Sequence, residues 1–222
     1  MESSRLYALL RGTWEFARVI RSTTDPSFSV SGVATFVAAA AAAAASSAHA
    51  GGGAAQRSLR YTERGVMRQE QAAAPASLPP LPPMDVKAEH VWHFPPAEQP
   101  PGAGAACAAA DPQAAATAHV HFADGRHFFT LALPELHCGQ SSARFTHLCD
   151  PDTYTGSLLV EAPPGAACRL TLAWAISGPK KSTEIRTTFF KLPEERAGEA
   201  AGGGGGSGSG SGSGAAAAAA AT

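Results

Sequence analysis

The chain of 222 residues has a nearly balanced charge, with 17 basic and 18 acidic side chains and a formal net charge of −1. Only 16% of the residues are charged, and no basic run is longer than the pair Lys180-Lys181. This composition argues against a nucleic-acid-binding protein, which needs a concentrated basic face to contact phosphates. No apolar stretch approaches the roughly 20 residues that span a bilayer, so no membrane partner is predicted.

Glycine, proline, alanine and serine dominate four blocks of low complexity: residues 37–57, 71–83, 97–117 and 199–222. The other residues, about 140 of them, are enough for one domain with its own hydrophobic core. We therefore predict a single domain over residues 1–196 that carries the first three blocks as disordered insertions. A disordered Gly/Ser/Ala tail is predicted for residues 197–222, because this segment has nothing with which to build a core.

The four cysteines, Cys107, Cys138, Cys149 and Cys168, show no CxxC spacing. We predict that they are reduced thiols and that the protein is cytoplasmic. A disulfide between Cys138 and Cys149 is the alternative for an oxidising compartment. No small-residue cleavage site follows the apolar side chains of the first ten residues, so no signal peptide is predicted.

Segments in the first half of the chain alternate apolar and polar side chains with a period of two, the pattern of half-buried strands. Residues 13–20 are the clearest case, with Arg18 between apolar side chains that share one face: Trp14, Phe16 and Ile20. Further strands are predicted at residues 31–36, 60–66 and 89–94.

The second half of the chain contains two strong turn signals. Asp124-Gly125 separates residues 118–122 from residues 128–133, and this arrangement predicts a β-hairpin. Gly178-Pro179 marks another turn. The remaining predicted strands are residues 157–161, 169–177 and 184–192.

The order of these elements decides the fold class. No segment outside polyalanine shows a sustained period of 3.6 residues, and strands do not alternate with helices. A parallel nucleotide-binding sheet is therefore disfavoured. We predict an all-β protein, a single antiparallel barrel of about 8–10 strands, with the low-complexity blocks inserted in its loops.

The most concentrated group of polar side chains lies in residues 147–156. His147 and Cys149 share a face if this segment is extended, and a second such pair, Asp152 and Tyr154, follows. Three interpretations remain open: a hydrogen-bonded corner capped by Asp152, a ligand-facing polar patch, or a Cys149 nucleophile activated by His147. The spacing lacks the ligand pairs of structural zinc sites, so no metal site is predicted.

Two basic residues beside predicted turns are candidate anchors for an anionic group on a ligand. Arg126 follows Asp124-Gly125, and Lys180 follows Gly178-Pro179. Guanidinium and ammonium groups recognise carboxylates, and both side chains would lie at the rim of a barrel. The alternative for each is turn formation with a surface charge.

The segment Pro79 to Pro83 contains overlapping PxxP steps. Such steps favour a polyproline helix, so an SH3- or WW-type partner is one hypothesis for this segment. A stiff loop without a partner is the other.

The opening segment resembles the first strand of calycin-type (lipocalin-like) barrels, in which Gly-x-Trp begins the strand. The motif here is Gly12-Thr13-Trp14. The resemblance implies that Trp14 packs across one closed end of the barrel beside a basic residue of the last strand. Arg186 is the candidate for that basic residue.

The ordered segments also resemble the uncharacterised family catalogued as domain of unknown function 6314. The matching motifs follow one another along the chain: Gly12-Thr13-Trp14, Gly32-x-Ala34-x-Phe36, Tyr61-x-Glu63-x-Gly65, Asp124-Gly125-Arg126-x-Phe128, His147-x-Cys149-x-Pro151-Asp152-x-Tyr154, and Gly178-Pro179-Lys180-Lys181. The family pattern places His after the Phe of the Asp-Gly-Arg strand, where this chain has Phe129. The resemblance implies a fold and a set of residues, and it implies no reaction.

Two functional hypotheses result. The first is a binding module that encloses a small hydrophobic or amphipathic ligand, with Arg126, His147, Tyr154 and Lys180 as polar anchors and Trp14, Cys149, Asp152 and Arg186 in support. The second is an enzyme that uses the polar group at residues 147–156 for acid–base chemistry. Related barrels bind haem, but nothing here singles out an axial ligand, so no cofactor is predicted.

Overall fold

The computed structural model describes residues 3–39, 57–70, 81–95, 116–134 and 139–193. The predicted C-terminal tail lies outside these ranges, and so does most of each predicted insertion. Cys107, Cys138 and the first two residues of the Pro79 to Pro83 segment also lie outside them. Within the described ranges, no helix has the length and apolar character needed to cross a bilayer.

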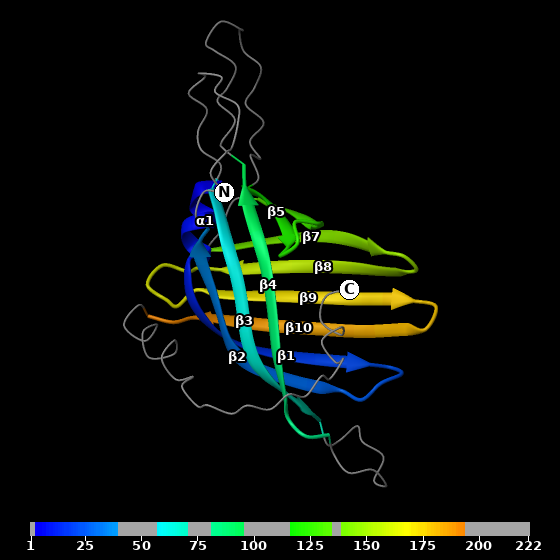
Figure 1. Ribbon diagram of the computed structural model, residues 1–222. Helices are drawn as coiled ribbons and strands as arrows, with labels where there is room; N and C mark the ends of the chain where they lie inside the picture. Colours follow the sequence, from blue (N-terminus) through cyan, green and yellow to red (C-terminus); the bar gives the residue numbers. More distant parts are fainter. Residues whose placement is uncertain (1–2, 40–56, 71–80, 96–115, 135–138, 194–222) are drawn as a thin grey trace, which may run out of the picture.

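The described residues form one sheet of ten antiparallel strands and one short helix (Figure 1). The elements are α1 (Ser3–Leu10), β1 (Gly12–Ser22), β2 (Phe28–Ala38), β3 (Arg57–Gln69), β4 (Met84–Phe94), β5 (Ala116–Phe122), β6 (His127–Leu133), β7 (Gln140–Cys149), β8 (Asp152–Glu161), β9 (Arg169–Gly178) and β10 (Lys181–Lys191). In Figure 1, β2 to β4 cross in front of β7 to β10.

The sheet curls into a nearly closed barrel. Its strand order is β6-β5-β4-β3-β2-β1-β10-β9-β8-β7, so β1 pairs with β10, and a single seam is left between β6 and β7. Side chains bridge this seam: the rings of Phe129 and Phe145 stack with centroids 4.3 Å apart, and the Ser141 hydroxyl donates to the Pro134 carbonyl at 2.8 Å. The predicted all-β antiparallel barrel is confirmed.

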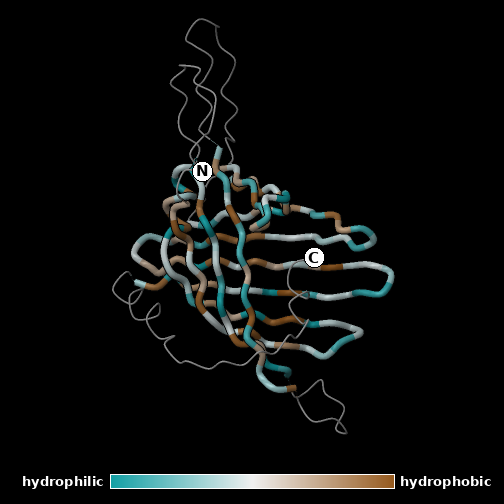
Figure 2. The backbone as a smooth tube through the Cα atoms, viewed as in Figure 1, coloured by the Kyte–Doolittle hydropathy of each residue, from teal (hydrophilic) through white to brown (hydrophobic). Residues whose placement is uncertain are grey.

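Apolar side chains from the inward faces of the strands fill the barrel. Hydrophobic and hydrophilic residues alternate along most strands (Figure 2), so each strand presents one face to the interior and the other to solvent. In the antiparallel pair of β2 and β3, Gly32 lies directly opposite Gly65. A Cβ atom at Gly32 would meet the carbonyl oxygen of Arg64, so this position requires glycine.

Two elements were not predicted from the sequence. Strand β7 has Ser141 and Ala143 on its inward face, side chains too small to give a strong hydrophobic alternation. Helix α1 has only eight residues, too few for its period to stand out. Its Leu6 and Leu10 are fully buried, and the helix packs on β4 and β5.

Trp14 packs at the end of the barrel that α1 covers, as the calycin resemblance implies. The indole Nε1 donates to the Leu10 carbonyl at 2.9 Å, and the Trp14 side chain is fully buried. The basic residue beside it is Lys191, whose Nζ lies 5.5 Å from the Trp14 ring centroid and donates to the Leu9 carbonyl at 2.7 Å. The prediction of Arg186 for this position is wrong, because Arg186 pairs with Val19, five residues further along β1.

Candidate functional site

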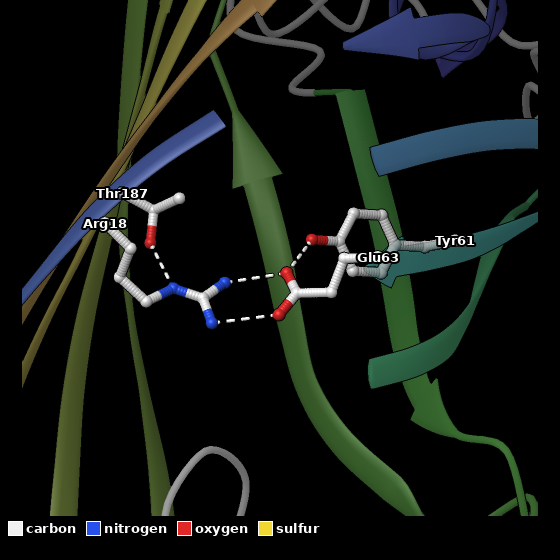
Figure 3. A network of polar contacts seen from close by, with 4 residues as sticks. All are labelled: Arg18, Tyr61, Glu63 and Thr187. Atoms are coloured by element: carbon white, nitrogen blue, oxygen red, sulfur yellow. Dashed lines mark hydrogen bonds and ion pairs between the residues drawn. The ribbon is translucent and has the colours of Figure 1, made fainter. Parts of the chain in front are cut away.

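A buried ion pair lies inside the barrel between Arg18 on β1 and Glu63 on β3 (Figure 3). Nη1 of Arg18 donates to Oε1 of Glu63 at 2.9 Å, and Nη2 donates to Oε2 at 2.7 Å. The guanidinium Nε also donates to the Thr187 hydroxyl on β10 at 2.9 Å. The side chain of Arg18 is only 12% exposed and that of Glu63 only 3%. The two charges are therefore stabilised by each other rather than by water.

Tyr61 completes this network from the same strand as Glu63. Its hydroxyl donates to Oε2 of Glu63 (Figure 3). Burial, reinforced by the Glu63 carboxylate, raises the pKa of the Tyr61 phenol well above its usual value. Burial by itself would lower the pKa of Arg18, but the adjacent carboxylate outweighs this, and the pKa lies above its usual value. The network therefore holds one positive charge, one negative charge and a neutral phenol.

Next to the network is an inner cavity of about 70 Å³ with mostly aromatic and aliphatic walls. Two polar side chains on β4, His90 and Trp92, line it. The buried Nδ1 of His90 and Nε1 of Trp92 have no hydrogen-bond partner among the described residues. Burial lowers the pKa of His90 below its usual value. The nearby Glu63 carboxylate raises this pKa, but by less than burial lowers it. His90 is thus neutral at pH 7.

A larger mouth cavity of about 420 Å³ lies toward the open end of the barrel. Phe128 and Trp174 line both cavities, and their rings stack with centroids 5.4 Å apart and planes at 17°. These two rings separate the inner cavity from the mouth. The other walls of the mouth cavity include Ile20, Phe28, Met67, Tyr154, Ile176 and Lys181.

A β-bulge explains how Phe128 reaches Trp174. The β5–β6 register pairs Val120 with Phe129 but His121 with His127, so Phe128 is the extra residue. A bulge changes the direction of side chains, and here both Phe128 and Phe129 are buried. The Phe129 ring stacks on Phe145 across the seam.

The structure brings the predicted polar group together where β7 pairs with β8, beside the mouth cavity that Tyr154 lines. His147 and Tyr154 lie opposite each other on β7 and β8, with ring centroids 5.9 Å apart, and Cys149 lies opposite Asp152. Nζ of Lys181 donates to Oδ2 of Asp152 at 3.2 Å and to the Tyr154 hydroxyl at 3.5 Å. Tyr154 is buried and lines the mouth cavity.

Arg126 and Lys180 are not part of this group. The Arg126 side chain is 72% exposed and forms an ion pair within its own turn, with Nε 2.7 Å from Oδ2 of Asp124. Lys180 is exposed in the turn between β9 and β10, and the adjacent Lys181 is the lysine that contacts Tyr154. Neither Arg126 nor Lys180 lines the mouth cavity.

The residues of the inner network were not among the site residues predicted from the sequence. The signal was a charge on an apolar face: Arg18 has the same parity along its strand as Trp14 and Phe16, and Glu63 has the same parity as Tyr61. Opposite charges on two apolar faces indicate a buried pair, although alternation does not identify the partner. Among the described residues, no group of three or more His, Cys, Asp or Glu is arranged to hold a metal ion.

The fold and the site together define a nearly closed antiparallel β-barrel with a polar network in its interior. A model of a family of unknown function, DUF6314, matches residues 107–191, which confirms the resemblance over this part of the chain. No curated protein matches the sequence. Among solved structures, the S-type phycobiliprotein lyase CPES from Guillardia theta is similar, with 8% identity, a TM-score of 0.49, and coverage of 87% of this chain and 94% of that chain.

Proposed function

We propose that the protein is a binding module that holds a small hydrophobic or amphipathic ligand in the mouth cavity. The observation that carries this proposal is the cavity itself. Its volume of about 420 Å³ falls within the range of roughly 300–1,000 Å³ that is typical of small-molecule sites. Aliphatic and aromatic side chains make most of its wall, and a few polar groups converge at one place.

The polar groups supply the anchor for the ligand. Lys181 contacts both Asp152 and Tyr154, and these hydrogen bonds outweigh the effect of burial, so the pKa of the Lys181 ammonium lies above its usual value. A charged ammonium next to a phenol orients a polar end of the ligand at the rim. We assign to Lys181 the rim position that was first predicted for Lys180.

The acid–base alternative has less support from the geometry. His147 makes ring contacts with Phe122, Phe128 and Tyr154. Within the described part of the chain, no hydrogen bond joins His147 to Cys149 or Asp152. Activation of the Cys149 thiol by His147 would need such a contact, at about 2.6–3.2 Å. Binding is therefore the function that we propose.

A cytoplasmic location remains part of the proposal. Cys149 and Cys168 are both free thiols, which is consistent with a reducing compartment. Thiol titration of the protein extracted without reductant tests this, since we expect every cysteine to react after denaturation. A lower thiol count that rises on reduction would contradict the assignment.

The first test is native mass spectrometry of the protein purified from its own source, in which we expect a retained small molecule. The second compares two variants for binding of a hydrophobic fluorescent probe such as 8-anilinonaphthalene-1-sulfonate. Thr183→Trp fills the mouth cavity, whereas Ser182→Trp adds the same side chain at the exposed neighbouring position. We expect Thr183→Trp to weaken probe binding at least tenfold and Ser182→Trp to leave it unchanged. Equal binding by both variants would refute the mouth cavity as the site.

A further inference from the structure

The inner cavity has a set of polar groups that is unusual in an otherwise apolar barrel interior. Trp92 is 8% exposed, and its indole nitrogen, which only donates, has no partner. Nδ1 of His90, two residues before it on the same inward face, also has no partner. A buried donor without an acceptor costs about 1–3 kcal/mol. The Trp92 N–H therefore needs a hydrogen-bond acceptor in the cavity, and none of the described residues provides one.

The acceptors that the protein does have here are already occupied. Both carboxylate oxygens of Glu63 accept hydrogen bonds, from Arg18 and from Tyr61. The Arg18 guanidinium is in turn committed to Glu63 and Thr187. Among the described residues, the buried side-chain nitrogen and oxygen atoms without a hydrogen-bond partner are Nδ1 of His90 and Nε1 of Trp92.

The charge balance of the cavity selects a neutral group. Arg18 and Glu63 are the charged side chains that line it, and their charges cancel. An anion placed here would have no excess positive charge to compensate its lost hydration, which is expensive in an apolar interior. A neutral oxygen with a lone pair, such as a carbonyl, satisfies the Trp92 N–H without this cost.

The walls of the cavity favour an aromatic body attached to that oxygen. The His90 ring stacks on Tyr61 at 5.8 Å and on Phe128 at 5.5 Å. Trp92 meets Phe36 and Phe129 edge-on at 5.6 and 6.2 Å. Flat rings pack well among such rings, both stacked and edge-to-face.

The volumes indicate how such a ligand is divided between the two cavities. The inner cavity, with about 70 Å³, has room for a group of a few heavy atoms, since one water needs roughly 10–15 Å³. The mouth cavity has room for the body. Phe128, which lies between them, is a bulge residue on β6, and β6 is at the end of the strand order.

We propose that the ligand is a neutral aromatic carbonyl compound, whose oxygen accepts a hydrogen bond from Trp92 in the inner cavity while its ring system lies against Phe128 and Trp174. This inference rests on the proposed binding function and adds the chemical class of the ligand. It also assigns a recognition role to Trp92 and His90.

Three probes of one shape test the proposal by calorimetric titration. The first is 2-acetylnaphthalene, which has the neutral carbonyl. In 2-isopropenylnaphthalene a CH₂ group replaces the oxygen, and 2-naphthoate carries an anion. We expect 2-acetylnaphthalene to bind the native protein about threefold to tenfold more tightly than 2-isopropenylnaphthalene, the effect of one neutral hydrogen bond. We expect 2-naphthoate to bind less tightly than 2-acetylnaphthalene.

Two Trp→Phe variants locate the hydrogen bond. In Trp92→Phe the side chain remains aromatic but the N–H is lost. The variant should therefore bind 2-acetylnaphthalene and 2-isopropenylnaphthalene with about equal affinity. Trp14→Phe is the matched control, because Trp14 lies at the closed end and lines neither cavity, and it should keep the native preference. If Trp92→Phe does not fold, the comparison of 2-acetylnaphthalene with 2-isopropenylnaphthalene on the native protein decides the proposal by itself.

The outcomes separate the two proposals. Equal affinity of the native protein for 2-acetylnaphthalene and 2-isopropenylnaphthalene would overturn the carbonyl inference. Tightest binding of 2-naphthoate would overturn it in favour of an anion site. In both cases a loss of binding in Thr183→Trp would leave the proposed binding function intact. If none of the three probes binds, the carbonyl inference fails, whereas the proposed binding function is still decided by native mass spectrometry and by the comparison of Thr183→Trp with Ser182→Trp.

Discussion

Arg18 and Glu63 are joined inside the barrel by two parallel hydrogen bonds of 2.9 and 2.7 Å, although 45 residues separate them in the sequence. They lie on β1 and β3, so the ion pair reaches past β2. Thr187 on β10 holds the guanidinium from the other side. The network thus ties three strands together in the interior and fixes the polar side of the inner cavity.

Loss of the Glu63 charge is expected to destabilise the fold strongly. In Glu63→Gln the guanidinium of Arg18 remains buried without its counter-charge, which typically costs about 3–5 kcal/mol. Urea unfolding measures this cost as a decrease in the free energy of unfolding. Glu15→Gln, at an exposed position of β1, is the matched control and should change it by less than about 0.5 kcal/mol.

The double variant Arg18→Met/Glu63→Leu sharpens this prediction. Because it removes both charges, it should be more stable than Glu63→Gln alone.

If Glu63→Gln lowers the free energy of unfolding by less than about 1 kcal/mol, the prediction for the single variant is wrong. Such a result would mean that water solvates the Arg18–Glu63 pair.

Gly32→Ala is expected to destabilise the pairing of β2 and β3. The added Cβ would meet the carbonyl oxygen of Arg64 and lie 2.5 Å from the Cα of Gly65, so the two backbones must separate. Overpacking of this kind costs roughly 1–3 kcal/mol. Thermal unfolding measures the effect, with Ser31→Ala on the exposed face as control. A melting temperature equal to that of Ser31→Ala would show that the strands tolerate the separation.

Lys191→Met is expected to loosen helix α1. The ammonium donates to the Leu9 carbonyl at the helix C-terminus and lies over the Trp14 ring, and a charged hydrogen bond of this type contributes roughly 1.5–3 kcal/mol. Amide hydrogen exchange should become faster in α1, while the strands remote from the closed end keep their protection. Lys180→Met removes an exposed lysine and should leave the exchange pattern unchanged. Unchanged α1 protection in Lys191→Met would contradict the anchoring role.

The stability of the protein is expected to fall below pH 6.5 in a way that depends on His90. Burial holds the pKa of His90 below its usual value of 6.5. As the pH falls through 6.5, the unfolded chain therefore binds a proton that the folded protein does not, and the free energy of unfolding decreases. The decrease ends below the pKa of the folded protein, where both states are protonated.

His90→Phe removes this contribution and keeps the stacked ring. Urea unfolding at pH 7 and pH 5 should show a smaller loss of stability in the variant than in the native protein. Other histidines contribute equally to both proteins, so the difference isolates His90. An identical loss in both would contradict a depressed pKa at this position.

The sequence by itself determined the class of the fold and which side chains share a face in the strands that it predicted. Alternation with a period of two assigned Trp14 and Phe16 to the interior, and the Asp124-Gly125 and Gly178-Pro179 turns marked two hairpins. The polar group around His147 and Tyr154 was also visible, because its residues are close in the sequence. Local patterns are sufficient for these features, since each depends on neighbouring residues only.

The tertiary structure alone decided which inward residues meet. Alternation assigned Arg18 to a face, but barrel closure and strand register selected Glu63 as its partner and Lys191, rather than Arg186, as the neighbour of Trp14. The bulge that turns Phe128 toward Trp174 likewise depends on how β5 and β6 pair. A period of two fixes the direction of a side chain, whereas its partner depends on register and closure, which are properties of the whole sheet.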